Sequence, residues 1–123
     1  LLIVDDNEYA RHLLTTIFEK CEAGVVAAGS ADQAFEELSR GKFDILVSDI
    51  EMPNQDGYAL IRKIRESEDE KIKSIPAIAL TAHARTEDRL RILSAGFDSH
   101  VAKPFEPAEL IAVIAGLARR VRG

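Results

Sequence analysis

The chain has 123 residues, a length that suits one globular domain with a real hydrophobic core and is too short for two. Hydrophobic residues make up 46% and charged residues 30%, an ordinary balance for a globular protein. A single cysteine excludes an internal disulfide, and the net charge of −5 argues against nucleic acid as a direct partner. No apolar run reaches the roughly 18 residues that span a bilayer, so we expect no membrane insertion by this segment. The single cysteine, Cys21, is expected to be a reduced helix residue, which is typical of a protein with a cytoplasmic location.

Five short apolar runs recur along the chain. The first begins at Leu1 without a preceding methionine, so we expect residues 1–123 to be a single domain cut from a longer chain. The runs are nearly continuous and partly β-branched, which is typical of strands buried on both faces of a parallel sheet. They are Leu1–Val4, Val25–Ala28, Ile45–Val47, Ala77–Leu80 and Ser99–Ala102.

Apolar side chains at helical spacing lie between these runs. A helix at about Glu87 to Ala95 has the poorest apolar stripe, and the charged run RKIRESEDEKIK (62–73) is predicted to be a solvated helix end and loop. The other four helices have stripes made of Ala10, Leu13, Leu14 and Ile17; of Ala31, Ala34, Phe35 and Leu38; of Leu60, Ile61 and Ile64; and of Leu110, Ile111, Ile114 and Leu117.

Capping residues agree with these helices. Ser30 with Gln33 predicts a capping box at the start of the second helix. Gly41 and Gly96 are placed where helices end, and Pro107 is placed at a first helical position.

Strand followed by helix, five times over, predicts an α/β fold: a five-stranded parallel sheet with five helices on both faces. Open sheets of this kind bind ligands beyond the carboxyl ends of their strands, where strand order reverses. With the flavodoxin-like order 2-1-3-4-5, the polar ends of four strands would be neighbours that face one crevice.

The residue types at these strand ends suit phosphoryl chemistry. Three carboxylates in one crevice would repel each other and raise each other's pKa, and Mg²⁺, which prefers oxygen ligands, is the economical compensation. A lysine adds a point charge suited to a phosphoryl oxygen, and a threonine adds a hydroxyl donor. The residues are Asp5, Asp6, Asp49, Thr81, Lys103 and Pro104.

Asp49, in the stretch SDIEMPNQDG, is the predicted nucleophile. No Ser-His or Cys-His pair is placed to offer another, and a carboxylate can attack phosphorus and carry an aspartyl phosphate. Mg²⁺ and Lys103 would neutralise charge as the group arrives. A single aspartate at a strand end is usually a turn residue, but three that converge with Thr81 and Lys103 favour a phosphoryl site.

Four segments in order, LLIVDDN, ILVSDIEMPNQDG, IPAIALTA and VAKPF, resemble the response-regulator receiver domain of two-component signalling, across essentially the whole chain. The resemblance implies that Asp49 accepts phosphate from a histidine kinase or a histidine phosphotransfer domain. It also implies that Asp6 ligates Mg²⁺ directly and Asp5 chiefly through water, with Asp49 and the backbone carbonyl of Glu51 as further ligands.

The resemblance implies roles for the remaining strand ends as well. Thr81 would hydrogen-bond the phosphoryl group after a switch, Lys103 would pair with it, and the Lys103–Pro104 peptide is expected to be cis. The family usually has tyrosine or phenylalanine where this chain has His100, so the aromatic switch is replaced here by an imidazole that we expect to make switching sensitive to pH.

Glu51 and His83 are predicted to flank the path of the water that hydrolyses the phosphate, because family members have tuning residues at these positions. The phosphoryl group is expected to change the surface around the fourth helix, the fifth strand and the fifth helix. The domain would catalyse only its own phosphorylation and dephosphorylation, and would not be an enzyme that turns over a separate substrate.

The segments ALTAHARTEDR, AGFDSHVAKP and PAELIAVIAGL are more similar to receivers fused to hybrid histidine kinases than to those of DNA-binding regulators. The parent chain is therefore expected to be such a kinase, with this segment in its cytoplasmic portion. Met52 and Pro53 are assigned to loop packing, whereas Tyr58 and Phe105 fit either packing or docking.

Two other classes of function stay open. A magnesium-dependent phosphatase with an aspartate nucleophile usually has Asp-x-Asp after its first strand, where this chain has Asp5-Asp6-Asn7, and turnover of a small phosphate ester would distinguish it. A receiver-like scaffold that binds partners without phosphorylation typically loses part of the acidic set, which is intact here. A calcium loop within NQDG lacks the ligand spacing.

Overall fold

The structure is a computed structural model that describes residues 1–20, 24–41, 43–52, 56–82 and 85–122. This part of the chain forms five strands and six helices. In chain order they are β1 (Leu2–Val4), α1 (Glu8–Glu19), β2 (Val26–Ala28), α2 (Ala31–Arg40), β3 (Leu46–Asp49), α3 (Gly57–Arg65), α4 (Glu70–Lys73), β4 (Ala77–Thr81), α5 (Thr86–Ala95), β5 (Ser99–Ala102) and α6 (Pro107–Arg122).

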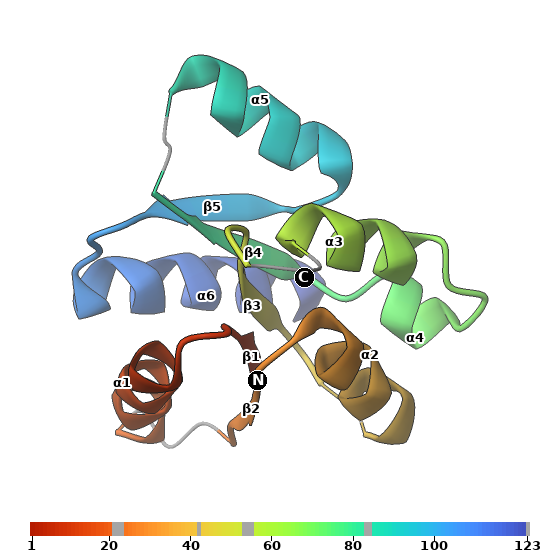
Figure 1. The fold of residues 1–123 in the computed structure, drawn as a ribbon, viewed down its shortest axis with the longest axis horizontal. Helices are drawn as coiled ribbons and strands as arrows, with labels where there is room; N and C mark the ends of the chain where they lie inside the picture. The colour runs from red at the N-terminus through yellow and green to blue at the C-terminus, as the bar shows by residue number, and fades with distance from the viewer. Residues whose placement is uncertain (21–23, 42, 53–55, 83–84, 123) are drawn as a thin grey trace.

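The strands form one parallel sheet in the order β2-β1-β3-β4-β5, which confirms the predicted fold class. The central strand β3 pairs through Leu46 with Leu2 on one side and with Ala77 on the other. Helices α1 and α6 cover one face, and α2, α3, α4 and α5 cover the other (Figure 1). All carboxyl ends of the strands therefore meet at one edge of the sheet.

Two hydrophobic cores lie on the two faces of the sheet. Leu2 and Val4 of β1 pack beneath α2 to α5, whereas Ile3 packs beneath α1 and α6. This alternation follows from the two-residue period of a strand. The prediction that all strands are buried on both faces is wrong for β2, because it is an edge strand and its Val26 is 38% exposed.

The apolar stripes predicted for α2 and α3 are confirmed, but the one predicted for α1 needs a correction. Leu13 is 45% exposed, whereas Leu14 and Phe18 are buried against the sheet. The buried face of α1 is centred on these two residues, one turn apart, and Leu13 lies about 100° away from Leu14 around the helix axis.

The charged run 62–73 contains the end of α3, as predicted, and the additional short helix α4, where the sequence predicts a loop. Asp69 caps α4 by accepting a hydrogen bond from the Lys71 amide at 2.9 Å, and Ile72 is buried in the core beneath α2 to α5. The described residues thus have a sixth helix where the sequence predicted five in all. Ile72 is the single apolar residue of this run beyond α3, and one isoleucine among charged and polar residues is too weak a signal to reveal a helix.

The predicted caps are largely confirmed. The Ser30 hydroxyl accepts a hydrogen bond from the Gln33 amide at 3.1 Å, but the Gln33 side chain accepts from the Gly29 amide at 2.8 Å, so the reciprocal half of the capping box uses the neighbouring residue. Gly96 ends α5 at a φ of 125°, a region that favours glycine.

Pro107 begins α6 as predicted, and Gly41 ends α2. Cys21, Pro53 and His83 lie outside the described residues. Among the helices described, none combines the length and the apolar character needed to cross a membrane.

Candidate functional site

Asp49 is the last residue of β3, and its side chain is buried, with 3% of the residue exposed. The ladder continues past it, because the Ile50 amide donates to the Leu80 carbonyl at 3.1 Å. The chain then turns, and the Glu51 amide donates back to Asp49 Oδ1 at 3.2 Å. The Asp49 carboxylate is therefore fixed at the carboxyl-terminal edge of the sheet, by the pairing of β3 and by the turn that follows this strand.

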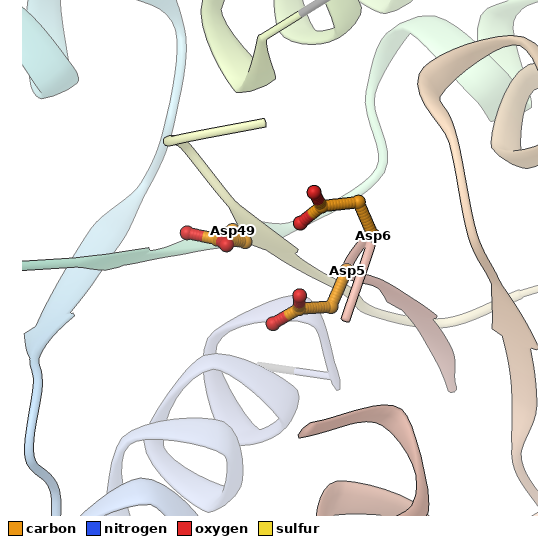
Figure 2. Close-up of side chains that lie close together, drawn as sticks. All are labelled: Asp5, Asp6 and Asp49. Atoms are coloured by element: carbon orange, nitrogen blue, oxygen red, sulfur yellow. The ribbon is translucent and has the colours of Figure 1, made fainter. Parts of the chain in front are cut away.

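Three carboxylates converge at this edge of the sheet. Asp5 is buried and Asp6 is exposed at the end of β1, and each offers a carboxylate oxygen within 4.8 Å of the others and of Asp49 (Figure 2). They meet because β1 and β3 are neighbours and run parallel. The predicted acidic cluster is thus assembled by the strand order.

Burial disfavours the ionised form of two carboxylates in the cluster, Asp5 and Asp49. Burial raises the pKa of Asp49 to about 6; Lys103 opposes this shift and the charge of Asp5 adds to it. Burial also raises the pKa of Asp5, against the hydrogen bond from the Asn7 amide at 2.9 Å. Crowded, desolvated oxygen donors are the kind of site that a hard divalent cation relieves.

Lys103 directly follows β5 and reaches the cluster from the end of that strand. Its Nζ lies 3.0 Å from Asp49 Oδ1, and its amide donates to the Thr81 carbonyl at 2.8 Å, which extends the pairing of β5 with β4. The Lys103–Pro104 peptide is cis, as predicted. The Lys103 ammonium group is thus paired with Asp49, one of the three carboxylates of the cluster.

Thr81 ends β4 and is 2% exposed. Its hydroxyl donates to Glu51 Oε1 at 3.0 Å, and the Ala82 amide lies 3.3 and 3.4 Å from the two Glu51 carboxylate oxygens. The sequence predicts that Thr81 and Glu51 are near the site, but not that they are bonded to each other. The sequence indicates only that β3 and β4 are neighbours, which brings Thr81 and Glu51 to the same edge of the sheet.

The loop after β3 is closed by a tight return to the strand. The Gly57 amide donates to the Ile50 carbonyl at 3.0 Å, and a Cβ atom at position 57 would lie 2.6 Å from the Asp49 carbonyl oxygen. Asp56 then caps α3 by accepting from the Ala59 amide at 2.9 Å. Met52 is buried at 7% exposure, which confirms its assignment to packing.

His100 lies in β5 opposite Ala79 and is half-buried. Burial lowers the pKa of His100, and the charge of Arg89 on α5 lowers it further. Its switching role, the water-path role of Glu51 and the metal-binding role of the Glu51 carbonyl stay predictions.

Two contacts near the site were not expected from the sequence. Arg11 of α1 donates through Nη1 to the Asp5 carbonyl at 2.8 Å, which fixes the turn after β1. Arg91 of α5 lies over the ring of Tyr58, 4.3 Å from its centroid, so Tyr58 of α3 packs against α5. Neither arginine belongs to a pattern that periodicity could single out.

The sequence matches the family model of the response regulator receiver domain over residues 1–115. The chain belongs to this family. Receiver domains act in phosphorylation-dependent two-component signal transduction, and the resemblance stated from the sequence is confirmed.

Curated relatives cover this receiver domain almost completely. An uncharacterized 14.6 kDa protein of Leptolyngbya boryana is 43% identical over 93% of this chain and 86% of its own length. Protein PetR of Rhodobacter capsulatus is 39% identical over 98% of this chain and 49% of its own length. This chain therefore spans about half the length of PetR.

Solved structures agree with the fold. The receiver domain of Francisella response regulator 1452 has a TM-score of 0.89 at 28% identity, covering 98% of this chain and 96% of that one. The receiver domain of a sensor histidine kinase from Pseudomonas aeruginosa, which holds a magnesium ion in its active site cleft, has a TM-score of 0.85 at 32% identity, covering 95% and 94%.

Proposed function

We propose that this receiver domain is a phosphorylation switch in which Asp49 accepts a phosphoryl group from a histidine kinase or a histidine phosphotransfer domain. The observation that carries the proposal is the position of Asp49: a buried carboxylate 3.0 Å from Lys103 Nζ and within 4.8 Å of the oxygens of Asp5 and Asp6. A nucleophile, a counter-cation and a set of oxygen ligands thus share one strand edge.

The carboxylates of Asp5, Asp6 and Asp49 would hold Mg²⁺, with the Glu51 backbone carbonyl as a further ligand. Magnesium prefers oxygen ligands, keeps several waters and binds through few carboxylates plus a substrate phosphate, so the donor set fits it. When bound, it supplies positive charge that stabilises the phosphoryl oxygens during transfer. The magnesium-containing receiver of the Pseudomonas aeruginosa kinase supports this assignment.

The protein groups have defined roles in the transfer. A carboxylate oxygen of Asp49 forms the bond to phosphorus while the bond from phosphorus to the donor's imidazole nitrogen breaks, and the imidazole keeps that electron pair. During transfer the Lys103 ammonium group exchanges its partner, from the Asp49 carboxylate to a phosphoryl oxygen on which negative charge lies. The Thr81 hydroxyl, already at the end of β4, donates to another phosphoryl oxygen.

The output surface is proposed to be formed by α5, β5 and α6. A phosphoryl group adds about −1.5 to −2 charge and three acceptor oxygens, and it shifts a surface only by binding one arrangement better than another. Leu90 and Leu93 of α5 are 61% and 47% exposed, which suits a surface that meets a partner. A hybrid histidine kinase is the proposed parent chain.

The central test is phosphorylation by acetyl phosphate with and without Mg²⁺, read by intact mass. The parent should gain one phosphoryl group only with Mg²⁺, Asp49→Asn should gain none, and Asp32→Asn, an exposed aspartate on α2, should behave as the parent does. Equal modification of Asp49→Asn would overturn the assignment. Sustained hydrolysis of p-nitrophenyl phosphate would instead indicate an enzyme that turns over a separate substrate.

A further inference from the structure

The Glu51 carboxylate engages two donors at the end of β4. The Thr81 hydroxyl donates to Oε1 at 3.0 Å, and the Ala82 amide lies 3.3 Å from Oε1 and 3.4 Å from Oε2. Thr81 is buried, so the orientation of its hydroxyl is set within the protein, whereas Glu51 is an exposed residue in the turn after β3. The carboxylate of an exposed residue thus accepts hydrogen bonds from a buried hydroxyl and a backbone amide.

These donors lie beside the phosphoacceptor. Asp49 pairs with Leu80 across β3 and β4, so Thr81 and Ala82 are the next two residues beyond that pair. A phosphoryl group on Asp49 would bring three strong acceptor oxygens to the same end of the sheet. A hydroxyl has one hydrogen to donate, as does a backbone amide. The Thr81 hydroxyl and the Ala82 amide therefore cannot both donate to the Glu51 carboxylate and to a phosphoryl group at the same time.

We infer that Glu51 is an internal latch: its carboxylate occupies the Thr81 and Ala82 donors in the unphosphorylated protein, and the phosphoryl group must displace it. This inference rests on the proposed function, because it assumes that Asp49 carries the phosphoryl group. The apparent affinity for a phosphoryl mimic is then the intrinsic affinity multiplied by the fraction of molecules whose latch is open. Glu51 acts on occupancy of the site without touching the reacting bond.

The latch also connects the site to α5. Glu51 and Thr81 line a cleft of about 470 Å³ together with Tyr58 of α3 and with Asp88 and Arg91 of α5. Arg91, which lies over the Tyr58 ring, offers the displaced Glu51 carboxylate a cation within this cleft. Release of the latch therefore changes the charge that faces α5.

Beryllofluoride titration at saturating Mg²⁺ tests the latch. Glu51→Ala removes the carboxylate, and Glu51→Asp keeps the charge on a side chain that is one methylene shorter and that we expect not to reach the two donors. We expect both variants to bind beryllofluoride about 10- to 150-fold more tightly than the parent, which is the range for losing hydrogen bonds to a charged group. Glu68→Ala, an exposed glutamate between α3 and α4, removes the same charge and should bind as the parent does.

The outcomes separate the latch from plain charge repulsion. If Glu51→Ala binds more tightly but Glu51→Asp binds as the parent does, charge alone is responsible and the latch is wrong. If both stay within about twofold of the parent, Glu51 does not compete at all. Failure of the parent to bind, or equal binding by Asp49→Asn, would instead overturn the proposed function.

A second readout does not depend on beryllofluoride. In the unphosphorylated protein with Mg²⁺, the Ala82 amide proton resonance should move upfield in both Glu51 variants, because its carboxylate acceptor is lost, and stay in place in Glu68→Ala. An unchanged Ala82 resonance in Glu51→Ala would overturn the latch, even if affinities changed.

Discussion

Arg65 and Asp98 form an ion pair with 3.1 Å between Nη2 and Oδ2, although 33 residues separate them in sequence. Asp98 Oδ2 also accepts from the Ala77 amide at 2.8 Å, at the start of β4. The same arginine donates to the carbonyls of Lys73 and Ile75, both at 2.7 Å. One guanidinium therefore joins the ends of α3 and α4 to the start of the sheet, at the edge opposite Asp49.

Arg65→Ala should lower the free energy of unfolding by about 2–4 kcal/mol, because it removes several hydrogen bonds from a charged donor and leaves partly buried carbonyls unpaired. Arg40→Ala is the matched control: its ion pair with Glu36 is between exposed side chains and should contribute less than about 1 kcal/mol. Urea denaturation of the three proteins measures both. Equal losses in the two variants would contradict the structural role of Arg65.

The charged run 62–73 shows what sequence patterns cannot reveal. Arg65 lies in this run, whose charges predict a solvated helix end and loop. Its side chain is nevertheless only 24% exposed, because its partners come from α4 and from the residues after α5. Periodicity reports on neighbours three or four residues away. Contacts over 31 and 33 residues are set by the folded sheet and leave no local signal.

The candidate site was more predictable than this network. Asp5, Asp49 and Lys103 follow apolar runs, and a parallel sheet brings all strand ends to one edge, so their convergence follows from the topology. The hydrogen bond from the Thr81 hydroxyl to Glu51 could not be predicted, because the rotamer of an exposed glutamate depends on which hydrogen-bond donors lie near it in the folded protein.

Gly57→Ala should distort the phosphoacceptor. Its Cβ would lie 2.6 Å from the Asp49 carbonyl and 2.9 Å from the Ile50 Cα, both backbone atoms, so the loop or the end of β3 must move. We expect a loss of about 1–3 kcal/mol in unfolding free energy, as for other overpacked sites, and slower phosphorylation by acetyl phosphate.

Gly116→Ala is the control for the glycine experiment, since nothing lies within 4 Å of a Cβ at that position in α6. It should stabilise the protein by about 0.5–1 kcal/mol, because alanine loses less backbone entropy than glycine in a helix. If Gly57→Ala matched Gly116→Ala in stability and phosphorylation rate, the close approach to Asp49 would be unimportant.

Asp49→Asn should stabilise the protein in the absence of Mg²⁺. The pKa of Asp49 is raised from 3.8 to about 6 in the folded protein, so the folded state holds its proton more tightly than the unfolded state. The stabilising contribution of that proton is fully present below about pH 4 and is lost as the pH rises through about 6. At pH 7.5, Asp49→Asn should gain about 1–3 kcal/mol over the parent.

Denaturation between pH 4 and pH 8, with and without Mg²⁺, checks this linkage. The parent should lose stability across that window more steeply than Asp49→Asn, and Mg²⁺ should restore the parent alone because it binds the ionised cluster. A parent that is the more stable protein at pH 7.5 without Mg²⁺ would show that Lys103 fully compensates the burial of Asp49.

His100 should make activation sensitive to pH. Burial, followed by the charge of Arg89, lowers its pKa below the ordinary value of 6.5, so the half-buried position in β5 favours the neutral imidazole. A proton on His100 therefore costs stability in this position, and its neutral form contributes stability above pH 6.5 that is lost as the pH falls. Protonation should favour an outward rotamer and oppose the activated arrangement, in which we expect the side chain to lie inward.

Beryllofluoride affinity at pH 8 and pH 6, with saturating Mg²⁺, measures this effect, because activation and protonation are reciprocally linked. The drop in affinity toward pH 6 should be about two- to fivefold larger in the parent than in His100→Phe, which has no titrating ring. His12→Phe, on the exposed face of α1, removes another imidazole and should keep the parent's profile. Superimposable profiles for the parent and His100→Phe would assign the remaining pH dependence to the acidic cluster and leave His100 without a role in switching.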